Sequence, residues 1–474
     1  MKIAGVQQKP HSLLQRLWIL LPLLAVCLLL SCAAVPDADR ILAEKKPDAG
    51  PARIVGARGP LTAEQSKELL KDIGASDALR RHLAIEQAVA ENPLVAGNAT
   101  RILRDGEETF SAIFKAIKAA RHHVNIEYYI LENINHHGTE LGELLIRKHR
   151  EGVAVNMIYD SFGSSKTPPE FFDRLKKGGV RVVEYNPMNP LEAKKEYSLM
   201  ERNHRKILVV DGNLAIVGGI NLSKTYQSSA GKSGGGDDLE NAYWRDTDIE
   251  VRGPVVAQVQ KLFLDHWQSQ KGPKIDTDGF FPKVPAQGDE LARVLGSTPE
   301  KEVPRYYVTL ISAIRNAQKN VWISNAYFVP TDDQIEDICA AARAGVDVRL
   351  LVPDKSDANI AIVMQRSHYK DLLKAGVRIY ETHGIVLHSK TVTIDGVWSV
   401  VGSSNLDQRS VVFNDEVDMV VVGEDTAAQL EKIYLQDLAE AEEITLAKWK
   451  KRPVTRKFKD FFLPIWIKTI ESSL

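Results

Sequence analysis

Two stretches of the sequence carry the same reactive side chains in the same order. In each stretch a histidine is followed two positions later by a lysine and, further on, by an asparagine. These residues are His204, Lys206 and Asn221 in RNHRKILVVDGNLAIVGGINLS, and His388, Lys390 and Asn405 in LHSKTVTIDGVWSVVGSSNLDQRS. An imidazole is a nucleophile or base when neutral and an acid when protonated. The lysines and asparagines would hold the non-bridging oxygens of an anion, so the two sets together favour phosphodiester chemistry that needs no metal or other cofactor.

Each stretch also predicts a β-hairpin that presents its histidine and lysine side by side. Asp211-Gly212 and Asp395-Gly396 stand between apolar runs, and Asp-Gly is a strong signal for a hairpin turn. Because side chains alternate along a strand, a histidine and a lysine two positions apart project from the same face. The two aspartates could belong to the reactive set or could simply build the turns, and the residues alone leave both roles open.

The elements around the two motifs predict a duplicated α/β chain. Two segments of the first half have counterparts in the second half. The helix-and-strand pattern TFSAIFKAIKAARHHVNIEYYIL corresponds to YYVTLISAIRNAQKNVWISNAYFVP, and LKKGGVRVVEYN corresponds to LLKAGVRIYETH. Such units favour two similar lobes, each a mixed sheet flanked by helices, with largely parallel strands and one active site at the interface between the lobes. We expect a linker and helical segment at residues 32–97, a first lobe at 98–290, a second lobe at 291–447 and a basic, aromatic tail at 448–474.

The paired motif, His-x-Lys-x4-Asp in both copies, resembles the signature of the phospholipase D superfamily. Together with HLAIEQAVAENPLVAGN, YWRDTDIEVRGPVV and GSSNLDQRSVVFNDEVDMVV, it is similar to the bacterial cardiolipin synthases over about residues 80–448. The resemblance implies that two phosphatidylglycerol molecules become cardiolipin and glycerol through a phosphatidyl-histidine. It further implies His204 as nucleophile and His388 as acid and base. The catalytic set that it implies is His204, Lys206, Asp211, His388, Lys390 and Asp395.

Carboxylates should orient the two imidazoles. Aligning VRG at Val251 with VVG at Val421 pairs Asp246 with Glu416, and these are the candidates for holding His204 and His388, each in the same copy as its histidine. The first copy is longer at this point because of a Gly/Ser-rich segment at residues 226–243, which would be either a lid or a plain surface loop.

Other readings of the site stay open at this stage. With water as the acceptor, the same residues would make a lipid-hydrolysing phospholipase D. A surface-tethered nuclease is less favoured because the net charge of −1 gives no electrostatic reason to expect nucleic acid as a partner. A non-catalytic lipoprotein would not need two complete motifs. The sequence shows no metal-binding pattern and leaves the acceptor alcohol and the oligomeric state unknown.

Both ends of the chain predict attachment to a membrane. Basic residues precede an apolar run at residues 17–30, which is too short for a span of about 20 residues and ends in Leu-Leu-Ser-Cys. Residues 1–31 therefore resemble a lipoprotein signal peptide with lipidation at Cys32 and placement on the periplasmic or cell-envelope side; an uncleaved signal anchor is the alternative. The tail at 448–474 mixes Lys and Arg with Trp and Phe, which suits an anionic membrane surface or packing on its own domain.

Overall fold

The computed structural model describes residues 35–45, 52–56, 58–90, 92–189, 198, 200–227, 242–299 and 303–452. The predicted signal peptide with Cys32, most of the Gly/Ser-rich segment and the tail beyond residue 452 lie outside the described residues. None of the described helices is both long and apolar enough to span a bilayer.

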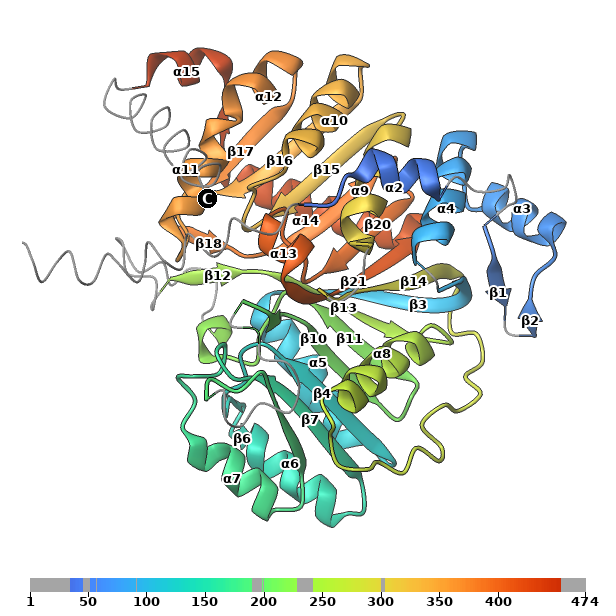
Figure 1. The fold of residues 1–474 in the computed structure, drawn as a ribbon, viewed down its shortest axis with the longest axis vertical. Coiled ribbons are helices and arrows are strands. Elements are labelled where there is room, and N and C mark those ends of the chain that lie inside the picture. The colour runs from blue at the N-terminus through green and yellow to red at the C-terminus, as the bar shows by residue number, and fades with distance from the viewer. Residues whose placement is uncertain are drawn as a thin grey trace, which may run out of the picture.

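Two lobes of mixed β-sheet lie one above the other, as Figure 1 shows, and this confirms the predicted fold class. The first-lobe strands, in spatial order, are β8 (Arg181–Tyr185), β7 (Ala154–Asp160), β4 (His123–Tyr128), β10 (Lys206–Val210), β11 (Leu214–Gly218), β13 (Thr247–Arg252) and β3 (Leu94–Arg104). The second-lobe strands repeat this order as β17 (Arg378–Thr382), β16 (Asp347–Pro353), β15 (Asn320–Asn325), β19 (Lys390–Ile394), β20 (Trp398–Gly402), β21 (Asn414–Val422) and β14 (Glu290–Ser297).

Strand direction differs from the prediction of largely parallel strands. Within these two rows of strands, parallel pairing is confined to β4, β7 and β8 in the first lobe and β15, β16 and β17 in the second. The remaining pairs in these rows are antiparallel, and they include the two motif hairpins, β10 with β11 and β19 with β20. Antiparallel pairing of β3 with β14 joins the two sheets, and β22 (Ala441–Ile444) extends the second sheet beyond β17.

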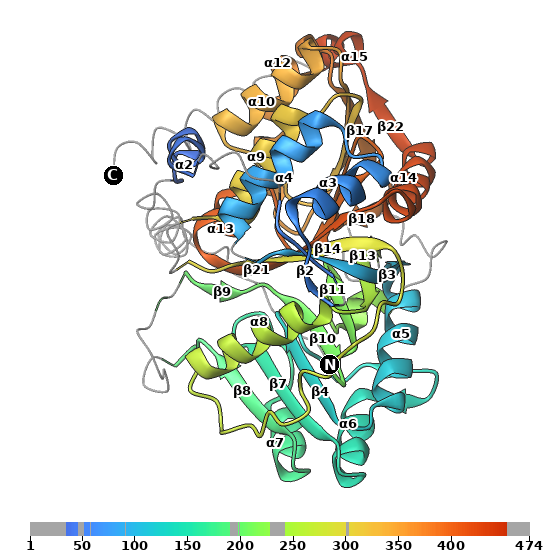
Figure 2. The same ribbon diagram turned by 90° about the vertical axis from the view of Figure 1, so that its right-hand side faces the viewer.

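Helices cover both faces of each sheet, and Figure 2 shows them on opposite sides of the strands. The first lobe carries α5 (Asp105–Ala119), α6 (Leu141–Arg150), α7 (Pro169–Lys177) and α8 (Val256–Ser269), with the short η2 (Lys224–Gln227). The second lobe carries α9 (Arg305–Asn316), α10 (Asp332–Arg343), α11 (Asn359–Ser367), α12 (Tyr369–Ala375), α13 (Gln408–Val412), α14 (Glu424–Ala439) and α15 (Leu446–Lys451). Five further short strands are β5 (Asn135–His136), β6 (Thr139–Glu140), β9 (Arg202–Asn203), β12 (Tyr243–Arg245) and β18 (Ile385–Leu387).

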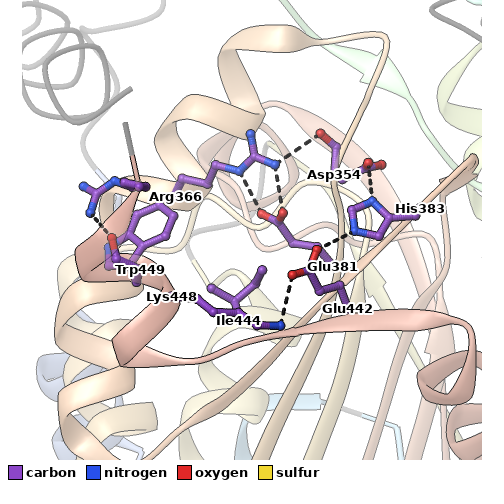
Figure 3. A pocket seen from close by; sticks show the side chains of 9 residues that line it. Asp354, Arg366, Glu381, His383, Glu442, Ile444, Lys448 and Trp449 are labelled. Atoms are coloured by element: carbon purple, nitrogen blue, oxygen red, sulfur yellow. Dashed lines mark hydrogen bonds and ion pairs between the residues drawn. The ribbon is translucent and has the colours of Figure 1, made fainter. Parts of the chain in front are cut away.

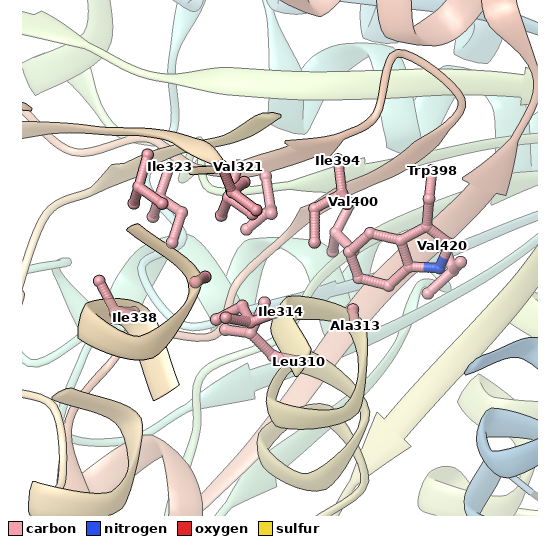
Figure 4. Packing of buried hydrophobic residues seen from close by; sticks show 14 of the residues in the cluster. Leu310, Ala313, Ile314, Val321, Ile323, Ile338, Ile394, Trp398, Val400 and Val420 are labelled. Atoms are coloured by element: carbon pink, nitrogen blue, oxygen red, sulfur yellow. The ribbon is translucent and has the colours of Figure 1, made fainter. Parts of the chain in front are cut away.

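Apolar packing fixes the lobes internally and against each other. In the second lobe, Leu310 and Ile314 of α9 pack against Val321, Ile323 and Trp398 of the sheet, as Figure 4 shows. Between the lobes, a separate cluster joins β10 and β11 to β20 and β21 through the side chains of Ile207, Val217, Val401 and Met419. Because these strands carry or adjoin the motifs, burying their apolar faces holds the two motifs in a fixed relation.

The N-terminal segment is more ordered than the predicted linker. It contains α2 (Ala38–Glu44), β1 (Ile54–Gly56), β2 (Gly59–Pro60), α3 (Ala63–Asp72) and α4 (Asp77–Ala90). The buried side chains of Ala38 and Ile41 pack with Tyr307 and Ile311 of α9. The linker expected at the start of residues 32–97 is therefore interrupted by α2, which packs on the second lobe through Ala38 and Ile41.

Candidate active site

The two motif histidines occupy equivalent positions at the carboxyl ends of parallel strands. β10 runs antiparallel to β4, so its first residue, Lys206, lies opposite Tyr128, the last residue of β4. His204 stands two residues before Lys206 and therefore lies just beyond that end of β4. In the second lobe, Lys390 lies opposite Asn325 at the end of β15. Each lysine ammonium donates to the carbonyl oxygen of its own motif histidine. The predicted side-by-side placement of histidine and lysine is therefore present in both copies.

Short parallel strand pairs tie each histidine to the opposite lobe. β9 pairs with the start of β21, and the amide of His204 donates to the Asp415 carbonyl over 2.9 Å. β12 pairs with β18, and the amide of His388 donates to the Arg245 carbonyl over 2.8 Å. The backbone of each motif histidine is therefore held by the backbone of the opposite lobe.

The orienting carboxylates are exchanged between the lobes. His204 Nδ1 lies 3.0 Å from Glu416 Oε2, and His388 Nδ1 lies 2.6 Å from Asp246 Oδ2. The sequence selected the right two carboxylates but assigned each to the histidine of its own copy, and the structure corrects that pairing. The cause is the strand exchange, because Asp246 follows β12 and Glu416 lies in β21. With Nδ1 bound to a carboxylate, Nε2 of each ring is left for chemistry; neither Nε2 has a hydrogen-bond partner among the described residues.

The two motifs share one electrostatic environment. Lys390 contributes to lowering the pKa of His204, and Lys206 contributes to lowering the pKa of His388. Together with the crossed contacts of His204 with Glu416 and of His388 with Asp246, these effects are those of a single site at the interface between the lobes. The catalytic residues expected at this interface are therefore brought together, apart from the two aspartates of the motif.

Burial dominates the proton affinities in this site. It lowers the pKa of His204 to about 4, although Glu416 opposes the shift, and it lowers the pKa of His388, with Lys390 adding to the effect. Burial also lowers the pKa of Lys206 to about 7 and that of Lys390 to about 8. A bound anion would oppose these shifts, because its charge would favour the protonated lysines and imidazoles that burial disfavours.

The carboxylate that holds His204 lies in a polar pocket. Glu416 accepts hydrogen bonds from Ser410 Oγ at 2.8 Å and Asn414 Nδ2 at 3.2 Å, and also from the Ser403 hydroxyl. Burial alone would raise the pKa of Glu416, but His204, Lys206 and Ser403 together lower it below its ordinary value. Glu416 is therefore a carboxylate anion whose charge is shared among several donors.

The carboxylate that holds His388 lies in an aromatic pocket with fewer donors. Asp246 Oδ1 accepts from the Thr247 amide at 2.7 Å, and a Cβ at Gly219 would approach that oxygen to 2.2 Å. The rings of Trp244 and Tyr327 lie 5.4 and 6.1 Å from the His388 ring. Glycine at position 219 therefore makes room for the carboxylate, where the second copy has Ser403 as a donor.

Sequence reasoning missed Tyr226, whose hydroxyl lies 3.0 Å from His388 Nδ1. Its counterpart in the second copy is Ser410, since both residues stand 5 positions after the motif asparagine. Both side chains act on the histidine of the opposite lobe, Tyr226 directly and Ser410 through Glu416. Extending the alignment of the two copies past the asparagines could have found this pair.

The two motif asparagines are buried in the site region. Asn221 Oδ1 accepts from the Ile130 amide at 3.1 Å, and its Nδ2 donates to the Tyr226 hydroxyl over 3.4 Å. Asn405 donates from its backbone to Ser410 Oγ at 3.0 Å, and its Oδ1 is buried without a hydrogen-bond partner among the described residues. Contact of either amide with a phosphate stays a prediction.

Asp211 and Asp395 are at the far ends of the motif strands and build turns. Both have left-handed backbone, with φ of 51° and 56°. Asp211 accepts hydrogen bonds from the amides of residues 121–123, and Asp395 from those of residues 318–320, at 2.7 to 3.1 Å. The structure therefore corrects their inclusion in the catalytic set: each carboxylate pins its hairpin to the loop before the neighbouring strand.

A cavity of about 320 Å³ lies elsewhere, at the outer edge of the second lobe. Figure 3 shows that its charged groups largely bind one another: Arg366 binds Glu381, and His383 bridges Asp354 and Glu442. Its lining includes none of the motif residues, so the reactive side chains meet elsewhere in the molecule.

The duplicated mixed-sheet fold, with two histidine–lysine pairs meeting at the lobe interface, defines an enzyme of the phospholipase D superfamily. The chain belongs to the family described as "Cardiolipin synthase, PLD-like domain", which matches residues 113–267 and 310–438. It is 34% identical over 391 residues to a cardiolipin synthase of Alkalihalophilus pseudofirmus, covering 82% of this chain and 75% of that protein. It is 35% identical over 362 residues to cardiolipin synthase 2 of Bacillus anthracis, covering 76% of this chain and 68% of that protein.

The fold is also similar to the crystal structure of phosphatidylserine synthase from Haemophilus influenzae Rd KW20. The TM-score is 0.60 at 13% sequence identity, and the match covers 82% of this chain and 99% of the other. At this identity the likeness concerns the fold alone.

Proposed function

We propose that this enzyme is a cardiolipin synthase that joins two phosphatidylglycerol molecules and releases glycerol. The observation that carries the proposal is the crossed pair of histidine–carboxylate contacts, His204 with Glu416 and His388 with Asp246, flanked by two buried lysines. The family match and the similarity to cardiolipin synthases support the same reaction.

The first half-reaction forms a phosphatidyl-histidine. Nε2 of neutral His204 attacks phosphorus, the bond from phosphorus to the headgroup glycerol oxygen breaks, and His388 gives that oxygen its proton so that glycerol leaves. In the second half-reaction His388 takes the proton from the glycerol hydroxyl of another phosphatidylglycerol. The resulting oxygen attacks phosphorus, the bond to His204 breaks, and cardiolipin is released with the enzyme restored.

The surroundings of the two carboxylates favour this division of roles. Glu416 shares its charge among Ser403, Ser410 and Asn414, so it stabilises a protonated His204 less than an unshared carboxylate would. Asp246 has the Thr247 amide as a further donor and lies only 2.6 Å from His388, so it is the stronger partner for an imidazolium. His204 is therefore the better neutral nucleophile and His388 the better acid.

The lysines would hold the phosphate oxygens. Their lowered pKa values mean that part of their charge returns only when the anion binds, which couples binding of the phosphodiester to protonation of the site. Each ammonium then stabilises the additional negative charge that develops on the non-bridging oxygens in both half-reactions.

Purified protein incubated with vesicles of phosphatidylglycerol tests the proposal by mass analysis of the lipids and of released glycerol. The expected result is cardiolipin and glycerol in equal amounts, lost together in His204→Ala. Phosphatidic acid as the main product would mean that water is the acceptor and the enzyme is a hydrolase. No lipid product from well-folded protein would contradict both.

We further propose that Cys32 is lipidated and tethers the enzyme on the periplasmic or cell-envelope side, where it would act at a membrane surface. Leu29-Leu30-Ser31-Cys32 after an apolar run supports this placement. Replacing Cys32 with Ala should abolish labelling with a lipid precursor, and unchanged labelling would contradict the lipoprotein assignment.

A further inference from the structure

Among the described residues, one group of side chains outside the active site has the composition of a transition-metal site. Glu107, His136 and His137 offer ligand atoms that all lie within 4.8 Å of one another. Glu107 is in the first turn of α5, and the histidines are at the turn between β5 and β6. His137 Nε2 is 3.2 Å from Glu107 Oε1, and the two imidazole rings are 4.1 Å apart between centroids.

His136 is held as a metal-binding imidazole would be. Its side chain is buried beside Phe114, with ring centroids 5.3 Å apart, and its Nε2 lies 3.0 Å from Ser111 Oγ. When Nε2–H donates to that hydroxyl, Nδ1 carries the lone pair that a metal needs.

The backbone of the hairpin presents His137 in a constrained geometry. His137 has a left-handed φ of 47°, and the following amide, that of Gly138, donates to Asn135 Oδ1 over 3.0 Å. The side chains of His137 and Glu107 are 73% and 68% exposed, so small rotations can bring them to bonding distance from an ion beside His136.

We propose that Glu107, His136 and His137 bind a divalent transition-metal ion, with zinc the best match. Two imidazoles and a carboxylate complete three positions of a tetrahedral zinc site, and water would take the fourth. The competing reading is a simple exposed pair of His137 and Glu107, which would contribute little to stability and would need no ion.

The cluster is linked through its neighbours in the chain to the His388 half of the active site. Two residues before Glu107, Asp105 Oδ1 accepts from the Asp246 amide at 3.1 Å. The intervening Gly106 touches η2 so closely that a Cβ there would lie 1.9 Å from the Tyr226 carbonyl oxygen. Asp246 and Tyr226 are the residues that contact His388 Nδ1 from the first lobe.

A second link runs from the hairpin to η2, since Gln227 Nε2 donates to the Asn135 carbonyl beside His136. An ion that joins α5 to the hairpin would therefore brace both elements that position Asp246 and Tyr226. This bracing of a catalytic half-site rests on the proposed function, whereas the binding of the ion does not.

The test uses the full chain, purified without a histidine tag, freed of metal, and titrated with zinc in a calorimeter. We expect one zinc ion per chain. His137→Ala and Glu107→Gln should each weaken binding by at least about tenfold. Glu170→Gln, an exposed first-turn glutamate on α7, is the matched control and should leave the affinity unchanged. Cobalt, which reports its ligands by absorption, should give a spectrum that His137→Ala changes.

Hydrogen exchange then measures the bracing without any lipid substrate. Zinc should slow exchange of the amides of residues 105–108 and 224–227 in the wild type and not in His137→Ala. Absence of stoichiometric zinc binding, or binding that His137→Ala and Glu107→Gln leave unchanged, would overturn the site. Because neither measurement uses phosphatidylglycerol, failure of the lipid assay and failure of the metal site are separate outcomes.

Discussion

The two halves of the active site share a backbone and differ in their side chains. In both, a short parallel strand pair brings the opposite lobe's carboxylate to Nδ1 of the motif histidine. Around His204 the carboxylate is surrounded by hydroxyl and amide donors, whereas around His388 it lies among aromatic rings. The duplication therefore supplies the frame for two reactive imidazoles, and later divergence of their neighbours gives them different roles.

A single pair of equivalent positions illustrates the divergence. Ser403 donates to Glu416, whereas Gly219 has no side chain and lets the shorter Asp246 pass close to the backbone. The acid and the nucleophile therefore need not differ in their own sequence motif, because the groups around each carboxylate are enough to separate the pKa values of the two histidines.

The largest effects should come from the histidines themselves. His204→Ala or His388→Ala should each lower cardiolipin formation by at least about 10³-fold, and the double variant should be no worse than the single ones, because the two groups act as one unit. Initial rates on phosphatidylglycerol vesicles measure this, with circular dichroism as the control for folding. Losses that multiply in the double variant would contradict a single site that needs both histidines.

The lysines should follow, with losses of roughly 10²- to 10³-fold for Lys206→Ala and for Lys390→Ala. Each change removes a buried ammonium from the phosphate site, so binding of tungstate, a phosphate mimic, should weaken as well. Lys166→Ala, at an exposed lysine, is the matched control and should leave both the rate and tungstate binding unchanged. A lysine variant with normal tungstate affinity would place that lysine outside the phosphate site.

Removing one carboxylate charge should change the pH dependence of the rate differently in the two half-sites. Glu416→Gln and Asp246→Asn should each lower activity by roughly 10²-fold or more, and each should lower the pKa of the histidine that it contacts, because an anion favours the imidazolium. His204 must be neutral, so Glu416→Gln should move the acid limb of the rate profile to lower pH. His388 must be protonated, so Asp246→Asn should move the alkaline limb to lower pH.

The crossed pairing decides which limb moves in which variant. If each carboxylate served the histidine of its own lobe, Asp246→Asn would move the acid limb and Glu416→Gln the alkaline one. Complete pH profiles of kcat/KM for the wild type and both variants distinguish the two arrangements.

The smallest effect on catalysis should come from the motif aspartates. Asp211→Asn and Asp395→Asn remove carboxylates that accept backbone amides, so each should destabilise the protein by about 1–3 kcal/mol. Asparagine still tolerates the left-handed backbone, so the rate per folded molecule should stay within about threefold of the wild type. Thermal unfolding and rates on the same preparations measure the two effects, and lost activity at unchanged stability would return the aspartates to the catalytic set.

Much of the site could be predicted because it depends on short-range patterns. The alternation of side chains places His204 beside Lys206, and aligning the two copies identified both Asp246 and Glu416. The exchange of these carboxylates could not be predicted, because it depends on β9 and β12, short strands that pair across the lobes and have no apolar period of their own. Sequence spacing alone favours the partner within the same copy.

The fold shows the same division. The internal repeat predicted two lobes with mixed sheets. The docking of α2 could not be predicted, because α2 contacts α9, whose residues are distant from it in the sequence. Likewise, His136 and His137 stand far from Glu107 in the chain, so no local metal-binding pattern marks them.

If His204 is the nucleophile, it carries the phosphatidyl group during turnover, and trapping this intermediate tests the assignment. Enzyme mixed briefly with phosphatidylglycerol, quenched in denaturant at mildly alkaline pH and digested, would be mapped by mass spectrometry. We predict a phosphatidyl group on the peptide that contains His204, and none there in His204→Ala. An adduct on His388 would exchange the roles of the two half-sites, and no adduct on either histidine during turnover would contradict the covalent mechanism.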